Sequence, residues 1–190
     1  MRPLFTIHAG EFLVGEYLEK RFPGLNIWIP TKDTGVDLLA TNPRTRQMCT
    51  LQVKLTRDYK AQDALDDFQR GLEAGGWLTL RHEAIERSTA DYWVIVLVSH
   101  ERRRNPIYLV VPPTALLRSL EAERGKAASY HFYPWVLRSG PAEKRVALNG
   151  RGMGQAQRAA LAAGTLHPGA RDLSAFLDAW GPLEALAAGT

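Results

Sequence analysis

The chain has 190 residues, of which 45% are hydrophobic and 23% are charged. These shares are ordinary for a folded globular protein and exclude disorder as the default state. Lys and Arg number 24 against 20 Asp and Glu, which gives a formal net charge of +4. A mildly basic chain is compatible with a polyanionic partner, but charge alone does not establish one. The length suits one domain with a substantial core.

The single cysteine, Cys49, excludes an internal disulfide and a cysteine-rich zinc site. It falls on the apolar face of an expected strand, so we interpret it as a small core residue. The N-terminal stretch has no long apolar region and contains His8 and Glu11, which argues against a signal peptide. The longest apolar run, 93–98, is too short to cross a bilayer. We therefore expect a cytoplasmic protein with no membrane association.

The first part of the chain predicts one helix followed by three strands. Apolar residues at helical spacing predict the helix over about 8–21, ended by Pro23 and Gly24. Strands are expected over 25–30, 35–41 and 47–56, with polar turns between them. Side chains of a strand alternate between its two faces. The third strand therefore presents an apolar face and a second face that carries Thr50, Gln52, Lys54 and Thr56.

The middle of the chain predicts a hairpin preceded and followed by helices. We expect a short helix within 58–77 that ends before Gly75 and Gly76, and a short helix or loop over 81–88. The run 91–99 is rich in β-branched and aromatic residues and predicts a fully buried strand. Its partner strand is expected over 107–112. A helix over 113–125 follows, with proline near its N-terminus.

The remaining residues predict shorter elements. An edge strand over 130–137, interrupted by Pro134, and a short strand over 145–149 are expected. Helices are expected over 154–164 and over 172–187, the second with Asp172 as its N-cap. We predict an α/β fold with a central mixed β-sheet flanked by helices. Within this single domain, residues 1–125 form the core and 126–190 form a C-terminal extension packed on it.

One carboxylate is unusual in its position, because Asp37 interrupts an otherwise apolar strand. A carboxylate there is costly unless it is paired, hydrogen-bonded or bound to a metal. The turn between the second and third strands brings Asp37 near Gln52 and Lys54. Carboxylate and amide oxygens are ligands that Mg²⁺ accepts. Lys54 is placed to hold or deprotonate a water, or to stabilise charge developing on phosphorus. A structural Asp37–Lys54 salt bridge is the alternative interpretation.

The order of these motifs resembles the PD-(D/E)xK nuclease superfamily, in particular its branch with glutamine in the last element. The matching segments, 10–18, 35–37 and 52–54, lie in the first third of the chain. The resemblance implies a restriction endonuclease-like core that uses Mg²⁺ or Mn²⁺. It assigns catalytic roles to Glu11, Asp37, Gln52 and Lys54, the first three as metal ligands. Glu16 is the weaker candidate for the helix glutamate.

Two departures from the family pattern are visible. Gly35 and Val36 precede Asp37, where the proline that gives the family its name would stand. This departure is common in the superfamily. Gln52 replaces the more usual acid, and the lost negative charge weakens metal binding. An inactive enzyme, or one that depends on a partner subunit, therefore remains an open alternative.

The function implied by the resemblance is metal-dependent hydrolysis of DNA phosphodiester bonds, in a defence or recombination context. RNA stays open as a substrate, and a homodimer is a further expectation of the family. Basic residues expected to flank the site are candidates for phosphate contacts, and they are Arg44, Arg46, Arg57 and Lys60. The alternative function is a non-catalytic module of nuclease fold that binds nucleic acid or a protein partner.

Other signals carry less information. The segment 149–154, Asn-Gly-Arg-Gly-Met-Gly, lies between an expected strand and helix and superficially suggests a phosphate-binding loop. It matches neither a Walker A motif nor a dinucleotide fingerprint, and we interpret it as a plain turn. The five histidines are dispersed without metal-ligand spacing. The triple arginine at 102–104 is equally compatible with a solvated turn and with phosphate binding.

Overall fold

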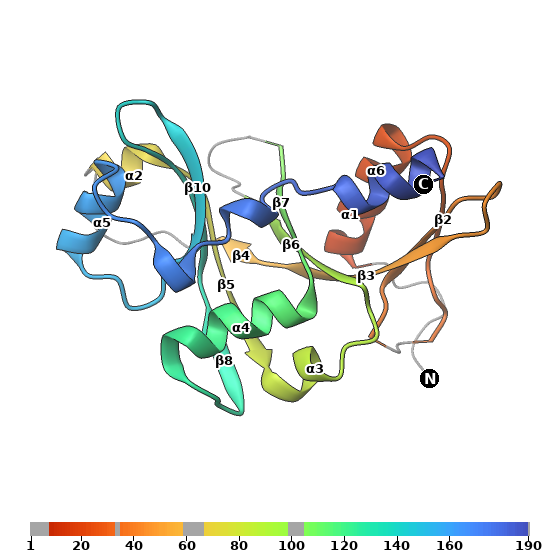
Figure 1. The fold of residues 1–190 in the computed structure, drawn as a ribbon, viewed down its shortest axis with the longest axis horizontal. Helices are drawn as coiled ribbons and strands as arrows, with labels where there is room; N and C mark the ends of the chain where they lie inside the picture. Colours follow the sequence, from red (N-terminus) through yellow and green to blue (C-terminus); the bar gives the residue numbers. More distant parts are fainter. Residues whose placement is uncertain (1–7, 33–34, 59–66, 99–104, 190) are drawn as a thin grey trace.

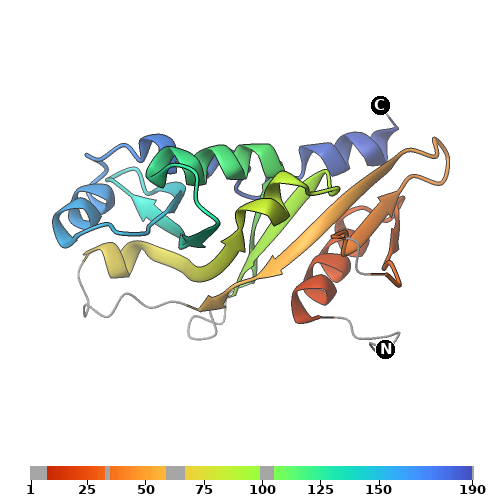
Figure 2. The same ribbon diagram turned by 90° about the horizontal axis from the view of Figure 1, so that it is seen from below.

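The computed structural model describes residues 8–32, 35–58, 67–98 and 105–189. Its strands form two five-stranded sheets that lie next to each other along an elongated molecule (Figures 1 and 2). The order of the first sheet is β1-β2-β3-β6-β7. The second sheet has the order β10-β9-β5-β4, and β8 pairs with β5 beside this path.

The first sheet is mixed. Only its central pair, β3 and β6, is parallel, and its other neighbours are antiparallel. The register places Leu38 opposite Leu51 and Gln52 opposite Trp93. This sheet confirms the predicted central mixed sheet, and it consists of β1 (Asn26–Trp28), β2 (Leu38–Thr41), β3 (Met48–Leu55), β6 (Tyr92–Leu97) and β7 (Ile107–Val111).

Helices cover both faces of the first sheet, which confirms the α/β class. The helices α1 (Ala9–Arg21) and α6 (Gly181–Ala188) share an apolar cluster with one face. On the other face, α3 (His82–Glu86) and α4 (Pro113–Arg124) join a cluster that also receives side chains from the second sheet. The inner face of the second sheet therefore packs on the first sheet through this shared cluster.

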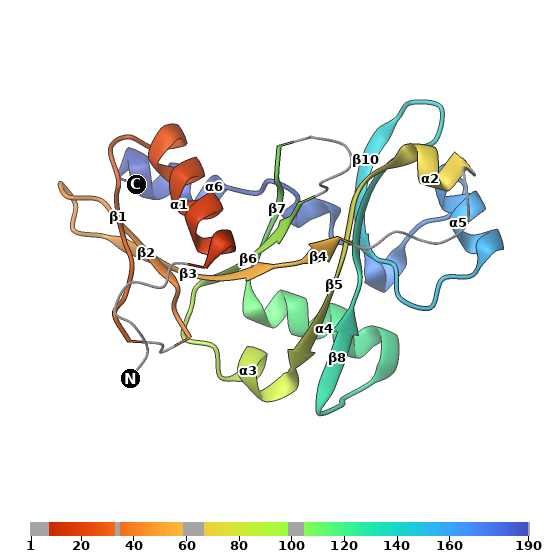
Figure 3. The same ribbon diagram turned by 180° about the vertical axis from the view of Figure 1, so that it is seen from behind.

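The second sheet is antiparallel throughout. Its outer face packs against α2 (Asp67–Gly71) and α5 (Gln155–Ala162) in a third cluster that includes Phe68 and Trp135. These two helices lie together at one end of the molecule (Figure 3). The strands of the sheet are β4 (Arg57–Asp58), β5 (Leu72–Arg81), β8 (Ser129–Phe132), β9 (Pro134–Ser139) and β10 (Lys144–Asn149).

A helix is present within 58–77, as expected, but the expected break at Gly75 and Gly76 is not. The helix α2 is short, and β5 begins at Leu72 and continues through Gly75 and Gly76. A β-carbon at Gly76 would overlap the side chain of Thr56. Glycine here permits two backbone segments to approach closely, which is a known use of glycine within strands. Gly76 therefore serves a close packing contact inside a strand and does not end an element.

Two other expectations in the C-terminal part are also wrong. Instead of one interrupted edge strand, β8 and β9 are separate, and β9 is hydrogen-bonded on both sides, by β5 and β10. Asp172 does not cap a long helix. Its Oδ1 accepts a hydrogen bond from the backbone N–H of Ser174 at 2.8 Å, and short 3-10 turns at Gly169–Arg171 and Ser174–Phe176 precede α6. This short local bond favours a turn over a helix start.

The predicted division into a core of residues 1–125 and an extension of residues 126–190 does not coincide with the division into two sheets. The strand β5, from the first range, lies at the centre of the second sheet. Conversely, Trp180, Leu183 and Leu186 from the second range are buried in the cluster of the first sheet. The C-terminal segment thus completes the core of the N-terminal sheet. No helix in the described part of the chain is long and apolar enough to span a membrane.

Cys49 lies in the core, as expected, with 6% of its surface exposed. Burial raises the pKa of its thiol to about 12, and the nearby Asp91 carboxylate adds to the rise. Because the thiolate is the reactive form, a higher pKa leaves less of it at pH 8. We expect the folded protein to react with a thiol reagent about a thousandfold more slowly than the chain unfolded in denaturant. Absorbance-monitored labelling measures this ratio, and equal rates in the two states would contradict it.

Candidate active site

Asp37 lies directly before β2 and is fixed to β3 by two hydrogen bonds. Its backbone N–H donates to the carbonyl oxygen of Leu51 at 2.8 Å. Its carboxylate Oδ2 accepts from the backbone N–H of Val53 at 2.7 Å. The carboxylate thus accepts a hydrogen bond from β3 at a point just before the first residue of β2. A hydrogen bond from a backbone N–H to a carboxylate is among the stronger kinds, so the side chain is held in place.

The side chains of Gln52 and Lys54 lie on the same face of the sheet as Asp37. Alternation of burial along β3 confirms this face, because Leu51 and Val53 are buried on the other. Lys54 Nζ is 3.9 Å from Asp37 Oδ2, and the two side chains are 32% and 17% exposed. This separation is too long for a hydrogen bond, so the contact is a Coulombic pair open to solvent. The site is half-buried and accessible.

An aromatic ring on the neighbouring strand borders the lysine. The Lys54 ammonium lies 5.5 Å from the centre of the Trp93 ring, within the range of a cation–π contact. The indole N–H of Trp93 donates to Ser88 Oγ at 2.9 Å, which fixes the ring. Trp93 is buried, with 1% of its surface exposed, so its ring belongs to the core of the sheet. Its ring therefore offers the ammonium group a weakly attractive surface.

Glu11 lies on the helix that covers the opposite face of the sheet. A β-carbon at the preceding Gly10 would lie 3.0 Å from Leu55 Cβ and 3.2 Å from Val53 Cγ1, so the start of α1 rests on the apolar face of β3. Glu11 Oε2 accepts from the backbone N–H of His8 at 3.2 Å, as in a capping box. Glu16, the weaker candidate, pairs with Lys20 at 2.7 Å. A metal-binding role for Glu11 stays a prediction.

Of the basic residues expected near the site, the structure describes the side chains of Arg44 and Arg46, and it places both away from Asp37. Arg44 and Arg46 lie in the exposed turn between β2 and β3, whereas Asp37 lies at the opposite end of this hairpin. The expectation that they flank the site is therefore wrong, because neighbours in sequence separate along the length of a hairpin. The backbone of Arg57 belongs to β4, its side chain is not described, and Lys60 and the triple arginine lie outside the described residues.

A second carboxylate on this face was not singled out from the sequence. Asp91 Oδ2 accepts from both the backbone N–H and the hydroxyl of Thr50, at 2.8 and 2.7 Å. The row of side chains on this face of β3 therefore begins at Thr50, which is hydrogen-bonded to Asp91, and continues through Gln52 to Lys54. The only sequence signal was an aspartate at the start of a buried strand. Finding its neighbours required the parallel register of β3 and β6.

The donor atoms of the site fit a hard divalent cation. Asp37 provides a carboxylate and Gln52 provides an amide oxygen, on one partly exposed face. Mg²⁺ commonly takes one or two protein ligands and fills its other positions with water and phosphate oxygens. Among the described residues, no group of three or more His, Cys, Asp and Glu side chains is arranged to hold a metal ion.

Comparisons with known protein families, with curated proteins and with solved structures found no match. Function therefore has to be inferred from the residues themselves. Asp37, Gln52 and Lys54 offer a carboxylate, an amide and an ammonium group on one face of the first sheet.

Proposed function

We propose that the chain is a metal-dependent nuclease that hydrolyses phosphodiester bonds in DNA. The observation that carries this proposal is the placement of Lys54 Nζ 3.9 Å from Asp37 Oδ2, on the sheet face that Gln52 shares. The order of these residues resembles the PD-(D/E)xK superfamily, in which such a group lies on neighbouring strands. Both charged side chains are partly exposed and thus accessible to a substrate.

Each residue has a separate role in this proposal. Asp37 and Gln52 would hold Mg²⁺ or Mn²⁺, and a bound ion supplies positive charge that offsets the charge of the phosphate oxygens. The hydrogen bond from Val53 fixes the Asp37 carboxylate before substrate arrives. Lys54 orients a water for in-line attack or stabilises the negative charge that develops on phosphorus. Trp93 lies beside the lysine ammonium on this face.

The first experiment is a cleavage assay with the purified chain. Plasmid, linear, single-stranded and branched DNA, together with RNA, are incubated with Mg²⁺, with Mn²⁺ or with a chelator. The proposal expects cleavage of at least one DNA form that requires the divalent ion. It also expects that cleavage is lost when Lys54 is replaced by methionine but not when the exposed Lys20, on α1, is replaced in the same way. Cleavage that persists in the chelator would contradict the proposal.

A substitution at Gln52 tests the metal site directly. Gln52→Glu adds a second negative charge beside Asp37 while keeping the size of the side chain. We expect the affinity for Mn²⁺ to rise by about tenfold, because ligand charge strongly tunes the affinity of oxygen sites for divalent ions. Calorimetric titration measures this change, and Gln47→Glu, in the exposed turn between β2 and β3, is the matched control. If both substitutions change the affinity for Mn²⁺ equally, Gln52 is not a metal ligand.

A second function, a non-catalytic module that binds nucleic acid or a protein partner, is favoured by one observation. The Asp37 carboxylate already accepts a backbone hydrogen bond and faces Lys54, so it has partners without a metal. In that case Asp37 and Lys54 are structural. Titration of the wild-type chain with Mn²⁺ separates the two functions, because the module shows no binding. Its Asp37→Asn variant then loses thermal stability rather than activity.

A further inference from the structure

The first sheet leaves part of one face exposed beside the candidate active site. The helices α1 and α6 lie on the other side of β1, β2 and β3, and α3 and α4 lie toward the second sheet (Figures 1 and 3). The strand register places Trp28 opposite Leu39, and Leu39 opposite Thr50. Side chains opposite each other share a face, and Thr50 shares its own with Gln52 and Lys54. The exposed face is therefore continuous with the candidate active site.

Three large apolar side chains meet on this exposed face, one from each strand. Trp28 of β1 is 55% exposed, Met48 of β3 is 62% exposed, and Leu39 of β2 is partly exposed. Met48 lies opposite Thr41, two residues further along β2 than Leu39. In the described part of the chain, none of the three packs into an apolar cluster of the core. Single exposed apolar residues are common, but three on neighbouring strands form an apolar surface that fits a ligand.

The indole ring of Trp28 is held near the sheet. Its N–H donates to Thr41 Oγ1 on the neighbouring strand at 3.0 Å. A threonine hydroxyl lies close to the backbone of its own strand, so this bond orients the ring along the sheet surface. Tryptophan offers a large contact area at a low cost in conformational entropy. The ring is thus positioned in advance for contact with a second flat ring.

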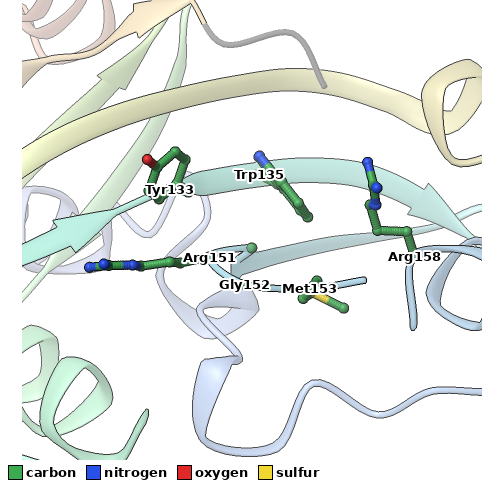
Figure 4. A pocket seen from close by; sticks show the side chains of 7 residues that line it. Tyr133, Trp135, Arg151, Gly152, Met153 and Arg158 are labelled. Carbon is green, nitrogen blue, oxygen red and sulfur yellow. The ribbon is translucent and has the colours of Figure 1, made fainter. Parts of the chain in front are cut away.

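Trp28 is the most exposed of the five tryptophans. Trp93 and Trp180 are buried in the core of the first sheet. Trp135 is also buried, although it borders a pocket of about 310 Å³ whose walls come from β9, α5 and the loop between β10 and α5 (Figure 4). Trp77, on β5, is 37% exposed. Trp28 therefore presents the largest fraction of a tryptophan surface to a ligand.

Positive charge lies at both ends of the exposed face. Residues 26–55 contain four lysines and arginines against two aspartates. Arg44 and Arg46 lie in the exposed turn just beyond Thr41, which holds the indole, and Lys54 lies toward the other end of β3. Surfaces that bind single-stranded nucleic acid combine cationic groups along the sugar–phosphate backbone with aromatic rings that stack on bases. The charge and the ring together favour such a strand as the occupant.

We propose that this apolar surface binds an unpaired base of single-stranded DNA, with the base stacked on Trp28 and the strand continuing to Asp37. Thr41, which holds the ring, is four residues from Asp37, and four residues of a strand span roughly 13 Å. Bases inside a duplex are stacked on their neighbours and expose only their edges in the grooves. Stacking on Trp28 thus requires DNA that is not paired at this position.

The preference for unpaired DNA as a substrate rests on the proposed nuclease function, whereas binding of a single strand requires neither cleavage nor a metal ion. A single strand is expected to bind in the presence of a chelator, and to bind the Asp37→Asn variant at least as tightly as the wild-type chain. Binding without any cleavage contradicts the nuclease alone. Metal-dependent cleavage without binding that involves Trp28 contradicts the stacking site alone.

Binding is tested with the full chain in a chelator and at constant salt, because affinity for DNA depends on salt. Fluorescence anisotropy compares a short labelled single strand with the same strand annealed to its complement. The single strand is expected to bind at least about tenfold more tightly than the duplex. Tryptophan emission gives a second readout, since stacking on a base quenches an indole. Titration of the wild-type chain with unlabelled single strand is expected to quench its emission.

Two substitutions of the same residue isolate the stacking contact. Trp28→Ala is expected to weaken binding of the single strand by about tenfold or more, because one stacked base is lost. Trp28→Phe keeps an aromatic ring, so affinity is expected to stay within about threefold while the quenching disappears. Phe12→Ala is the matched control, because Phe12 is 58% exposed on α1, on the other side of the sheet. Its effect is expected to stay within about twofold.

Thermal unfolding shows that each variant is folded. Absent binding of the single strand, equal affinity for the duplex, or equal affinity of Trp28→Ala and the wild-type chain would each overturn the proposal. Light scattering tests another occupant of the apolar surface, a second copy of the chain. A dimer that Trp28→Ala converts to monomers, together with absent DNA binding, would assign the surface to self-association and overturn the proposal as well.

Discussion

Replacing Asp37 by asparagine is expected to lower metal-dependent DNA cleavage by about 10²–10³-fold, the usual cost of removing one charge-stabilising group. Asparagine keeps the size of the side chain and an oxygen that accepts the 2.7 Å hydrogen bond from Val53. It removes the negative charge that holds a divalent ion and that faces Lys54. The substitution is therefore expected to reduce cleavage and to leave the fold intact. Initial rates of plasmid nicking in Mg²⁺ measure it.

The control for this variant is Asp172→Asn. Asp172 also accepts a hydrogen bond from a backbone N–H through its carboxylate, at 2.8 Å from Ser174, but lies among the turns before α6. Its substitution is expected to leave cleavage unchanged. Equal rates for Asp37→Asn and the wild-type chain would show that the cleavage comes from other residues or from a contaminating enzyme. A large drop in thermal stability without loss of cleavage would favour the structural ion pair.

The second large effect concerns stability. Trp180→Ala is expected to lower the free energy of unfolding by about 3–5 kcal/mol, as for other large buried aromatic residues. Trp180 is 1% exposed, and its ring centre lies 5.0 Å from that of Tyr17 and 5.4 Å from that of Tyr108. These rings join α1, β7 and the segment before α6. Urea-induced unfolding measures the change.

Trp28→Ala, on β1 of the sheet against which Trp180 packs, is the control for this variant. Trp28 is 55% exposed on β1, and its indole N–H donates to Thr41 Oγ1 at 3.0 Å. Its loss is expected to cost about 1 kcal/mol, the usual value of one exposed hydrogen bond and its contacts. If Trp180→Ala costs no more than Trp28→Ala, the segment around α6 does not contribute to the core of the first sheet.

Much of the candidate site could be predicted because it is local. The alternation along β3 placed Gln52 and Lys54 on one face, and the turn at 42–47 made β2 a neighbour of β3. Together these patterns fix the approach of Asp37 to Lys54 without knowledge of the rest of the chain. The central hairpin of β6 and β7 followed in the same way from two apolar runs close in sequence.

Long-range contacts could not be predicted in this way. Gly75 and Gly76 carry a turn signal, and only the presence of Thr56 against Gly76 explains why a strand passes through them. Helical spacing predicted α1 but not which face of the sheet it covers, so the position of Glu11 stayed undetermined. The pocket of the second sheet depends on β9, on α5 and on Arg171, which meet only in the folded chain. The periodicity of apolar residues along the sequence does not indicate which distant elements come into contact.

The closure of the first sheet by α6 has a consequence for synthesis of the chain. Arg21 and Glu184 form an ion pair across 163 residues. Leu183 and Leu186 cover an apolar face to which α1, β2, β3, β6 and β7 contribute. At about 5–20 residues per second, a ribosome needs roughly ten seconds to pass from β3 to α6. Until α6 is synthesised, the part of this apolar face that Leu183 and Leu186 cover in the folded chain lacks its cover. The first sheet therefore acquires its complete core only after nearly the whole chain has been synthesised.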